Sequence, residues 1–243
     1  MFAGQRVAVA SPQGRFDARE VDGRRLDRVE AYGKHWFAWF DGDAVVHVHL
    51  GLFGKWATFL EAAPLPRETV RMRWTGSSAT IDLIGPTVCA VGNPSLYDSV
   101  VARLGPDPLR RDADSERFVL RVARSKQSVG QLLMDQSVVA GVGNVYRAEA
   151  LFVRGIWPER VGQDVGDIEA AEIWKVLVTM LRAGVKSGQI VTVPRKERPA
   201  LAPADGKINY VYKRDRCLRC ASAIRRWDMA GRWCYACPTC QPR

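Results

Sequence analysis

The 243-residue sequence contains no uninterrupted apolar run that approaches the length of a membrane-spanning helix. Its first residues, MFAGQRVAVASPQGRF, also lack the apolar stretch of a secretory signal peptide. Apolar residues make up 47% and charged residues 26%, values typical of globular proteins, so a disordered or fibrous chain is excluded. These features predict a soluble, cytoplasmic protein that is long enough to form one large domain or two smaller ones.

Excess positive charge is nearly absent from most of the chain and is concentrated at its end. Residues 1–194 carry 24 Lys or Arg against 22 Asp or Glu, whereas residues 195–243 carry twelve against four. A basic segment attracts polyanions because each neutralised phosphate releases condensed counterions. The distribution therefore indicates a nucleic-acid partner for the C-terminal segment.

The first hundred residues have the pattern of a β-rich domain. Runs rich in β-branched and aromatic residues occupy positions 7–10, 24–31, 35–40, 44–50, 70–74 and 79–84. Two short segments between such runs, DGD at 41–43 and GSS at 76–78, have the composition of hairpin turns. No helical pattern lies between the runs, so this region is expected to form a sandwich or a barrel.

Helical periodicity begins near residue 93. Asn93 precedes a proline, a combination that suits the start of a helix over residues 95–103. The connector LGPDP at 104–108 is stiff and marks the expected domain boundary. Further helices are predicted for residues 115–123, 129–138, 145–153 and 168–186, with Gly155 and Gly188 as stop signals. Residues 189–215 are predicted to be a linker that leads to the cysteines.

Four of the six cysteines form a pattern typical of a metal site. Cys217 and Cys220 are separated by two residues, as are Cys237 and Cys240, with sixteen residues between the pairs. The spacing predicts a tetrahedral Zn²⁺ site, which is structural because four protein ligands leave no open position. Disulfides are the alternative, although a cytoplasmic setting disfavours them. The metal would hold together a hairpin too short to fold around its own core. The other two cysteines are expected to be buried or idle thiols.

Two glycine-containing segments each have two interpretations. Arg232 follows Gly231 at the expected tip of the C-terminal hairpin, where it is either solvated or held toward a phosphate or base. The segment AGVGN at 140–144 lies between two predicted helices. Its glycines allow the backbone to approach a phosphate, and the following helix N-terminus attracts anions. An ordinary turn between two helices has the same composition.

Lys34 and two histidines lie at the ends of predicted strands. Lys34 follows Gly33 among apolar strands, so it is either a buried cation that points into a cleft or a solvated strand-end residue. His47 and His49 share one face of a strand, which permits a metal pair. No third ligand is nearby, and two histidines leave a zinc site short of ligands.

Together these segments resemble the formamidopyrimidine-DNA glycosylase and endonuclease VIII family of base-excision repair enzymes over about residues 4–241. The resemblance lies in YGKHWF, HLGLFG, LGPDPL, LLMDQSVVAGVGNVYRAEALF and GRWCYACPTCQ. It implies an α+β fold with an N-terminal β-sandwich (1–103), a hinge (104–114), a helix–two-turn–helix domain (115–208) and a four-cysteine zinc hairpin (209–243). It also implies a monomer with one structural Zn²⁺ and no membrane association. Its partner would be double-stranded DNA with oxidised bases or abasic sites, bound between the two domains.

The resemblance assigns DNA contacts to four residues. Asn144 corresponds to the helix–two-turn–helix asparagine that binds a phosphate. Arg232 corresponds to the zinc-hairpin arginine that contacts the phosphates flanking the flipped nucleotide. Leu52 and Phe53 correspond to side chains that enter the gap left by the extruded base, where an apolar wedge offsets part of the unstacking energy.

The resemblance also assigns catalytic roles to Lys34, Glu149 and Arg232. Lys34 corresponds to the β-hairpin lysine that contacts the lesion-side phosphate and assists catalysis, and Glu149 to a glutamate near the active-site water. The implied activity is that of a DNA glycosylase and AP lyase acting by β/δ-elimination through a Schiff base at C1′. The segment IDLIGPTV at 81–88 lacks the double-arginine–phenylalanine element of purine-type members, which favours oxidised pyrimidines.

The first residues depart from the family pattern. Family members begin Met-Pro-Glu, where the proline amine is the nucleophile and the glutamate its acid/base partner. This sequence begins MFAG, which matches the family just after its first helix. We favour a start upstream that includes Met-Pro-Glu, because the DNA-contacting motifs are present. The alternatives are a truncated, non-catalytic protein that binds damaged DNA or abasic sites, and a zinc-ribbon adaptor. The 243-residue chain is expected to be less stable than one that includes the helix, since that helix would cover apolar surface.

Overall fold

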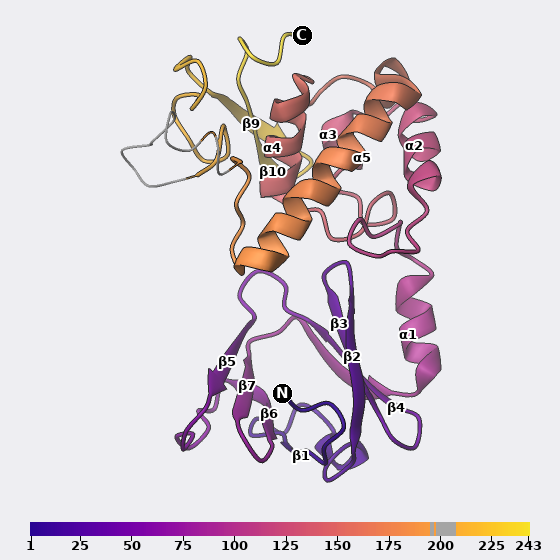
Figure 1. Ribbon diagram of the computed structural model, residues 1–243, viewed down its shortest axis with the longest axis vertical. Helices are drawn as coiled ribbons and strands as arrows, with labels where there is room; N and C mark the ends of the chain where they lie inside the picture. Colours follow the sequence, from indigo (N-terminus) through magenta and orange to yellow (C-terminus); the bar gives the residue numbers. More distant parts are fainter. Residues whose placement is uncertain (195–196, 198–207) are drawn as a thin grey trace. The chain divides into compact units, whose positions relative to one another are not determined.

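The computed structural model describes residues 1–194, 197 and 208–243. The chain divides into two compact units, Met1–Arg103 and Leu104–Arg243. The first consists mainly of strands, and the second mainly of helices with a two-stranded hairpin (Figure 1). Within the part of the chain that the structure describes, no helix is both long and apolar enough to cross a membrane.

The first unit is built from two four-stranded antiparallel sheets. One has the order β1-β6-β7-β5 and the other the order β2-β3-β4-β8. The strands are β1 (Ala8–Ala10), β2 (Leu26–Tyr32), β3 (His35–Phe40), β4 (Ala44–His49), β5 (Lys55–Phe59), β6 (Val70–Thr75), β7 (Thr80–Ile84) and β8 (Val88–Gly92), and helix α1 (Pro94–Val101) follows them. Both sheets contribute to one hydrophobic core, which confirms the predicted β-sandwich.

Side-chain alternation decides which face of a strand is buried. In β6, Val70, Met72 and Trp74 are buried and the residues between them are only half-buried. Met72 and Trp74 share a core with Leu26 and Phe40 of the other sheet. Full burial of an apolar side chain of this size stabilises the fold by about 1.5–3 kcal/mol. The alternation in β6 therefore contributes directly to the packing of the two sheets.

A cavity of about 310 Å³ interrupts this packing. Its lining includes Val29 of β2, Trp36 of β3, Trp56 of β5 and Trp74 of β6, so it lies between the two sheets. The Trp36 ring centroid is 5.2 Å from that of Trp56 and 5.4 Å from that of Trp74. The buried indole N–H of Trp74 has no hydrogen-bond partner among the described residues. Packing and polar satisfaction are therefore both incomplete at this point.

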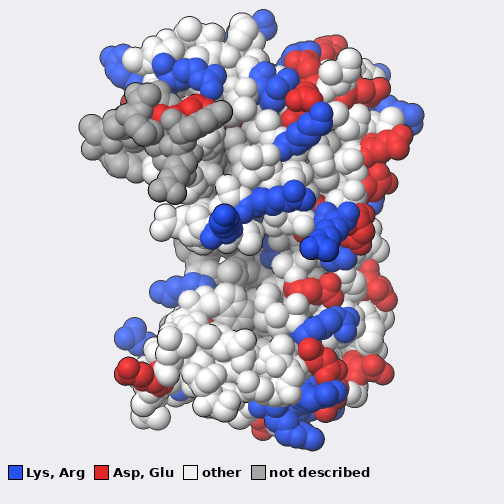
Figure 2. Space-filling model, in the orientation of Figure 1, with Lys and Arg blue, Asp and Glu red and all other residues white. Residues whose placement is uncertain are grey.

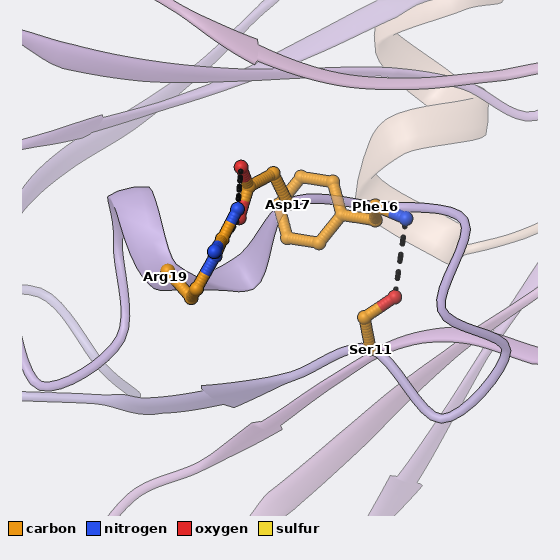
Figure 3. Close-up of polar contacts among 4 residues, drawn as sticks. All are labelled: Ser11, Phe16, Asp17 and Arg19. Carbon is orange, nitrogen blue, oxygen red and sulfur yellow. Dashed lines mark hydrogen bonds and ion pairs between the residues drawn. The ribbon is translucent and has the colours of Figure 1, made fainter.

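The segment between β1 and β2 contains the short 3-10 helix η1 (Ala18–Glu20). The Ser11 hydroxyl accepts a hydrogen bond of 3.1 Å from the amide of Phe16, whose ring is buried (Figure 3). At the surface, Arg19 donates two hydrogen bonds of 2.9 Å to Asp17. An exposed ion pair contributes little to stability. The buried ring of Phe16 is therefore the main anchor of this segment.

The second unit combines helices with a β-hairpin. Its elements are α2 (Ser115–Ala123), α3 (Val129–Leu132), α4 (Asn144–Arg154), α5 (Gly162–Ser187), β9 (Arg225–Met229) and β10 (Arg232–Ala236). Phe118, Leu151 and Leu177 represent the core shared by α2, α4 and α5. A second apolar cluster contains Phe152 of α4 and Tyr210, whose rings stack at 4.8 Å. This cluster packs the cysteine-containing region against α4.

Local sequence signals explain where these helices begin and end. The side chains of Asp114 and Ser128 cap α2 and α3, because each accepts a hydrogen bond from a backbone amide in the first turn. Gly155 and Gly188 follow α4 and α5 in the left-handed conformation, with φ of 66° and 67°. Both glycines were predicted as stop signals, and both are confirmed.

The predicted helix over residues 129–138 is wrong beyond its first turn, because α3 is only 4 residues long. The Asp135 side chain accepts hydrogen bonds from the amide and the hydroxyl of Ser137. The Gln136 side chain bonds to the backbone of Gly141 and Val142. Such side-chain contacts compete with helical hydrogen bonds, so the chain turns here and leads into α4.

Three further elements differ from the sequence predictions. The helix predicted for residues 168–186 belongs to α5, which begins earlier and contains a non-helical break at Gly166 with φ of 68°. The break separates the first turn from the rest, which explains why the periodic pattern starts only after it. Strands β5 and β8 had no clear sequence signal, since they consist largely of half-buried residues without strict alternation.

Candidate nucleic-acid interface and metal centre

Four cysteine side chains meet next to the β9–β10 hairpin. The Sγ atoms of Cys217, Cys220, Cys237 and Cys240 all lie within 4.8 Å of one another. Sγ–Sγ distances are 3.9 Å for Cys217–Cys240, and 3.5 Å for both Cys220–Cys237 and Cys220–Cys240. A tetrahedron with Zn–S bonds of about 2.3 Å has sulfurs about 3.8 Å apart. Disulfide sulfurs are only about 2.05 Å apart. The cysteines therefore form one cluster with the geometry of a tetrahedral metal site.

Hydrogen bonds hold the second cysteine pair against the end of α4. The Cys240 amide donates to the Cys237 sulfur at 3.4 Å. The buried Gln241 side chain accepts from the Cys237 amide at 3.0 Å and donates to the Ile156 carbonyl at 2.8 Å. Because Ile156 directly follows the C-cap of α4, the cluster has a fixed position in the second unit.

Cys89 and Cys234 lie outside the cluster. Cys234 on β10 is fully buried, and burial raises the pKa of its thiol. Burial also raises the pKa of Cys89, on β8, to about 12. Both thiols stay protonated at neutral pH, so they are poor nucleophiles and poor ligands. This agrees with the prediction of buried or idle thiols.

Arg232 is exposed at the first position of β10. It follows a two-residue turn in which Ala230 and Gly231 have φ of 53° and 75°, as in a type I′ hairpin. The next side chain, Trp233, is 55% exposed, and the Arg226 guanidinium lies 5.5 Å from its ring centroid. The hairpin thus presents cations beside an exposed aromatic ring, a combination that suits nucleic acids.

The residues around this hairpin are strongly basic. Residues 208–243 carry eight Lys or Arg against two Asp or Glu. Figure 2 shows several Lys and Arg side chains at this end of the second unit, with some Asp or Glu beside them. One divalent ion bound by four thiolates would subtract about two charges. The region stays basic even then, as a surface that binds phosphates requires.

The glycine-rich turn before α4 brings the start of this helix to the hairpin. Gly141 has φ of 86°, a conformation that favours glycine, and Gly143 is the extended N-cap of α4. The Asn144 side-chain amide donates to the Trp233 carbonyl at 2.9 Å. The helix N-terminus, which attracts anions, is therefore bonded to the strand that begins with Arg232.

Glu149 is fully buried on α4 and accepts four hydrogen bonds. Its Oε2 accepts from the Thr192 hydroxyl and the Tyr210 amide, both at 2.6 Å. Its Oε1 accepts from the amides of Val211 at 2.8 Å and Tyr212 at 2.9 Å. Burial raises the pKa of Glu149, and the four hydrogen bonds oppose that rise. All four acceptor positions of the carboxylate are used, so it holds residues 210–212 against α4.

In the first unit, the residues predicted to contact DNA lie in two turns. Lys34 is exposed in the two-residue turn between β2 and β3, which decides against a buried cation. Leu52 and Phe53 are 78% and 87% exposed in the turn after β4. A Cβ at Gly51 would lie 1.9 Å from the Thr87 hydroxyl, so this turn needs glycine. Adjacent exposed apolar side chains on a tight turn suit insertion into a partner.

All three histidines of the chain gather in the first unit. Strand β3 places His35 beside His47 and His49, a neighbour that their spacing in the sequence does not reveal. Nδ1 of His35 and Nε2 of His47 share a hydrogen bond of 2.9 Å, and the His35 and His49 ring centroids are 4.8 Å apart. Among the described residues, however, only the four cysteines form a group able to hold a metal ion.

Stability of the first unit is expected to fall on acidification because of His47. Burial, with smaller contributions from His49 and Arg103, lowers the pKa of His47 from 6.5 to about 4. The folded state therefore binds fewer protons than the unfolded state between about pH 6.5 and 4, and stability is lost as the pH falls through this window. The change in pKa corresponds to at most about 3 kcal/mol.

Urea unfolding of wild type and His47→Gln between pH 4 and 8 measures this effect. The variant is expected to show a flatter dependence of unfolding free energy on pH below 6.5, and no difference in slope between pH 7 and 8, which serves as the internal control. Parallel curves at all pH values would contradict the assignment to His47.

Comparison with known proteins agrees with this architecture. The sequence matches the formamidopyrimidine-DNA glycosylase N-terminal domain over residues 3–83 and the formamidopyrimidine-DNA glycosylase H2TH domain over residues 104–195. It is 44% identical to Endonuclease 8 1 of Mycobacterium tuberculosis, with 99% of this chain and 93% of the relative covered. It is 30% identical to formamidopyrimidine-DNA glycosylase of Herpetosiphon aurantiacus, with 92% and 84% covered.

Solved structures show the same fold. A complex of Lactococcus lactis Fpg with DNA that contains an abasic site has a TM-score of 0.80 and 19% identity, and the match covers 100% of this chain and 94% of the other. A β-sandwich unit followed by a helical unit with a four-cysteine hairpin thus defines the Fpg-like fold class. The chain belongs to the formamidopyrimidine-DNA glycosylase and endonuclease 8 family, which confirms the resemblance seen in its motifs.

Proposed function

We propose that this protein is a base-excision repair DNA glycosylase that removes oxidised bases, with a preference for pyrimidines, and cleaves abasic sites as an AP lyase. The observation that carries the proposal is the hydrogen bond from Asn144, at the start of α4, to the β10 strand that begins with Arg232. This bond holds an anion-attracting helix end against the strand whose first residue, Arg232, is exposed, and two such groups suit adjacent phosphates of one strand.

Different residues would make different contacts with the DNA around an extruded nucleotide. Asn144 and Arg232 would bind backbone phosphates, and Lys34 would contact the phosphate on the lesion side. Leu52 and Phe53 would occupy the space left in the base stack, which their exposure makes possible without unfolding. The free energy of unstacking a base is a few kcal/mol, and it is lowest for a damaged base, so these contacts favour lesions.

The preference for oxidised pyrimidines has two supports. Residues 81–88, IDLIGPTV, lack the double-arginine–phenylalanine element of purine-type members. The 44% identity to an Endonuclease 8 exceeds the 30% identity to a formamidopyrimidine-DNA glycosylase. Together these features support the proposed preference for oxidised pyrimidines.

The lyase reaction of this proposal needs an amine nucleophile. The amine attacks C1′ as the bond from C1′ to the base breaks, and the base leaves after it gains a proton. The amine then gives up its proton, and the sugar ring opens as the C1′–O4′ bond breaks and O4′ takes up a proton, which gives the Schiff base. The Schiff base acidifies the C2′ hydrogens, and loss of one of them allows the 3′ phosphate to leave by elimination. Lys34 would assist catalysis through its contact with the phosphate on the lesion side. Glu149 would act indirectly. Its carboxylate holds residues 210–212 in place, and that segment would lie near the active-site water.

The proposal is tested by base release and covalent trapping on the chain extended at its N-terminus by the family's Met-Pro-Glu helix, because the proline of that helix would supply the amine that the lyase reaction needs. Duplexes of one sequence carry thymine glycol, 8-oxoguanine, an abasic site or no lesion, and borohydride reduces any Schiff base to a stable adduct. We expect faster release of thymine glycol than of 8-oxoguanine, and an adduct at the abasic site. Selective binding of abasic DNA without release or adduct would instead support a non-catalytic damage-binding protein. Equal affinity for intact and abasic duplexes would contradict both and support a zinc-ribbon adaptor.

We further propose one Zn²⁺ per chain at the four-cysteine cluster. Four thiolates match the ligand preference of this ion, and the closed tetrahedron gives it a structural role. When bound, the ion supplies no reaction chemistry, and its effect is to hold the hairpin that carries Arg232. The protein would act as a monomer on double-stranded DNA in the cytoplasm.

A further inference from the structure

Arg147 is a charged side chain in the interior of the second unit. It lies on α4, is 1% exposed, and is among the largest fully buried side chains. A guanidinium stays protonated in proteins, and burial of a charge without a counter-charge is costly. No ion pair joins Arg147 to a carboxylate in the described part of the chain. Other contacts must therefore compensate for the burial of the Arg147 charge.

The hydrogen-bond partners of Arg147 are neutral. Nη2 donates to Oδ1 of Asn144 at 2.6 Å and to the Trp233 carbonyl at 2.9 Å. Nη1 makes a long contact of 3.5 Å with the Gly130 carbonyl. Nε is buried without a hydrogen-bond partner among the described residues. The positive charge is thus only partly compensated within the protein.

Asn144 completes a closed arrangement around the Trp233 carbonyl. Its Oδ1 accepts from Arg147, while its Nδ2 donates to the same carbonyl at 2.9 Å. The side-chain amide is therefore fixed in one orientation, with one N–H left for a ligand. Trp233 directly follows Arg232 in β10, so Arg147 connects the two residues proposed to bind phosphate.

We propose that Arg147 is a positioning residue for DNA binding, which orients Asn144, ties α4 to β10, and adds a buried positive charge behind the bound phosphate. The proposal rests on the proposed function of the chain. A phosphate at the start of α4 supplies the counter-charge that Arg147 lacks in the free protein. Because Arg147 is buried, its attraction for the phosphate is screened less than that of a surface cation.

The test is a double-mutant cycle on a duplex that contains a tetrahydrofuran analogue of an abasic site. Arg147→Met and Asn144→Ala are each expected to weaken binding by about 10-fold or more, since each removes a charge-assisted contact or its acceptor. The double variant is expected to lose less affinity than the product of the two single losses, because Arg147 acts in part through Asn144. Arg147→Lys keeps the charge but not the two-pronged geometry, so it should recover only part of the affinity.

Arg154→Met, the same substitution on the same helix, is the matched control and is expected to leave affinity unchanged. Thermal unfolding verifies that each variant is folded, and Arg147→Lys supplies the same cycle if Arg147→Met does not fold. Wild-type affinity in the folded Arg147 variants, or losses that multiply with that of Asn144→Ala, would overturn the proposal. The proposed function fails separately, if the wild-type chain itself does not prefer the abasic duplex over the intact one.

Discussion

Replacement of Cys237 by serine is expected to release the metal from the cysteine cluster and to weaken binding of an abasic-site duplex by about 100-fold or more. The β9–β10 hairpin has only two strands, and an isolated two-stranded hairpin is marginally stable in water. Structural Zn²⁺ contributes about 10–16 kcal/mol of binding free energy in small zinc domains. Without the ion the hairpin melts, and Arg232 loses its position relative to α4.

Elemental analysis and fluorescence anisotropy measure the two effects on one sample. The wild-type chain is expected to hold one Zn²⁺, and Cys237→Ser to hold less than one. Cys234→Ala is the matched control, because this buried cysteine lies on β10 but outside the cluster. It should retain both the metal and the affinity. A Cys237→Ser variant that binds DNA as tightly as wild type would show that the hairpin does not depend on the cluster.

Arg232→Ala is expected to weaken binding of the abasic duplex by about 10- to 100-fold, since a hydrogen bond to a charged group contributes about 1.5–3 kcal/mol. Loss of one phosphate contact also lowers the slope of log K against log salt by about 0.9. The side chain is exposed at the hairpin tip, so the unfolding midpoint should stay unchanged. Both effects follow only if the guanidinium contacts a phosphate directly.

Titrations at several salt concentrations distinguish a specific contact from general attraction. Arg225→Ala is the matched control, because Arg225 is an exposed arginine on the neighbouring strand β9. It should reduce affinity for intact and abasic duplexes alike and by only a small factor. Equal losses in the two variants would indicate a diffuse basic surface in which Arg232 has no special role.

The parts of the fold that could be predicted are those specified by short sequence segments. The cap at Asn93, the stop signals at Gly155 and Gly188, and the strand β6 each depend on a few neighbouring residues. The predicted helix over 129–138 failed because Gln136 bonds to backbone groups five and six residues further along the chain. A helical pattern contains no sign of that competition.

In the site, too, the features that could be predicted are local in sequence, and those that could not depend on contacts between distant residues. The four cysteines could be found because each pair is a local motif, and two such motifs at this spacing predict a single cluster. His35 and Arg147 could not be found. His35 joins the other histidines only through the pairing of β3 with β4, and Arg147 reaches Trp233 from 86 residues away in the chain.

The sequence by itself therefore determined most of the strands and helices, the four-cysteine cluster, the basic C-terminal segment and the family. These properties follow from local spacing and composition. Only the tertiary structure decided that Asn144, Arg147 and the Trp233 carbonyl form one arrangement, and that Glu149 is saturated by four donors. The physical reason is that buried polar groups select partners by position and direction in space, which distance along the chain does not specify.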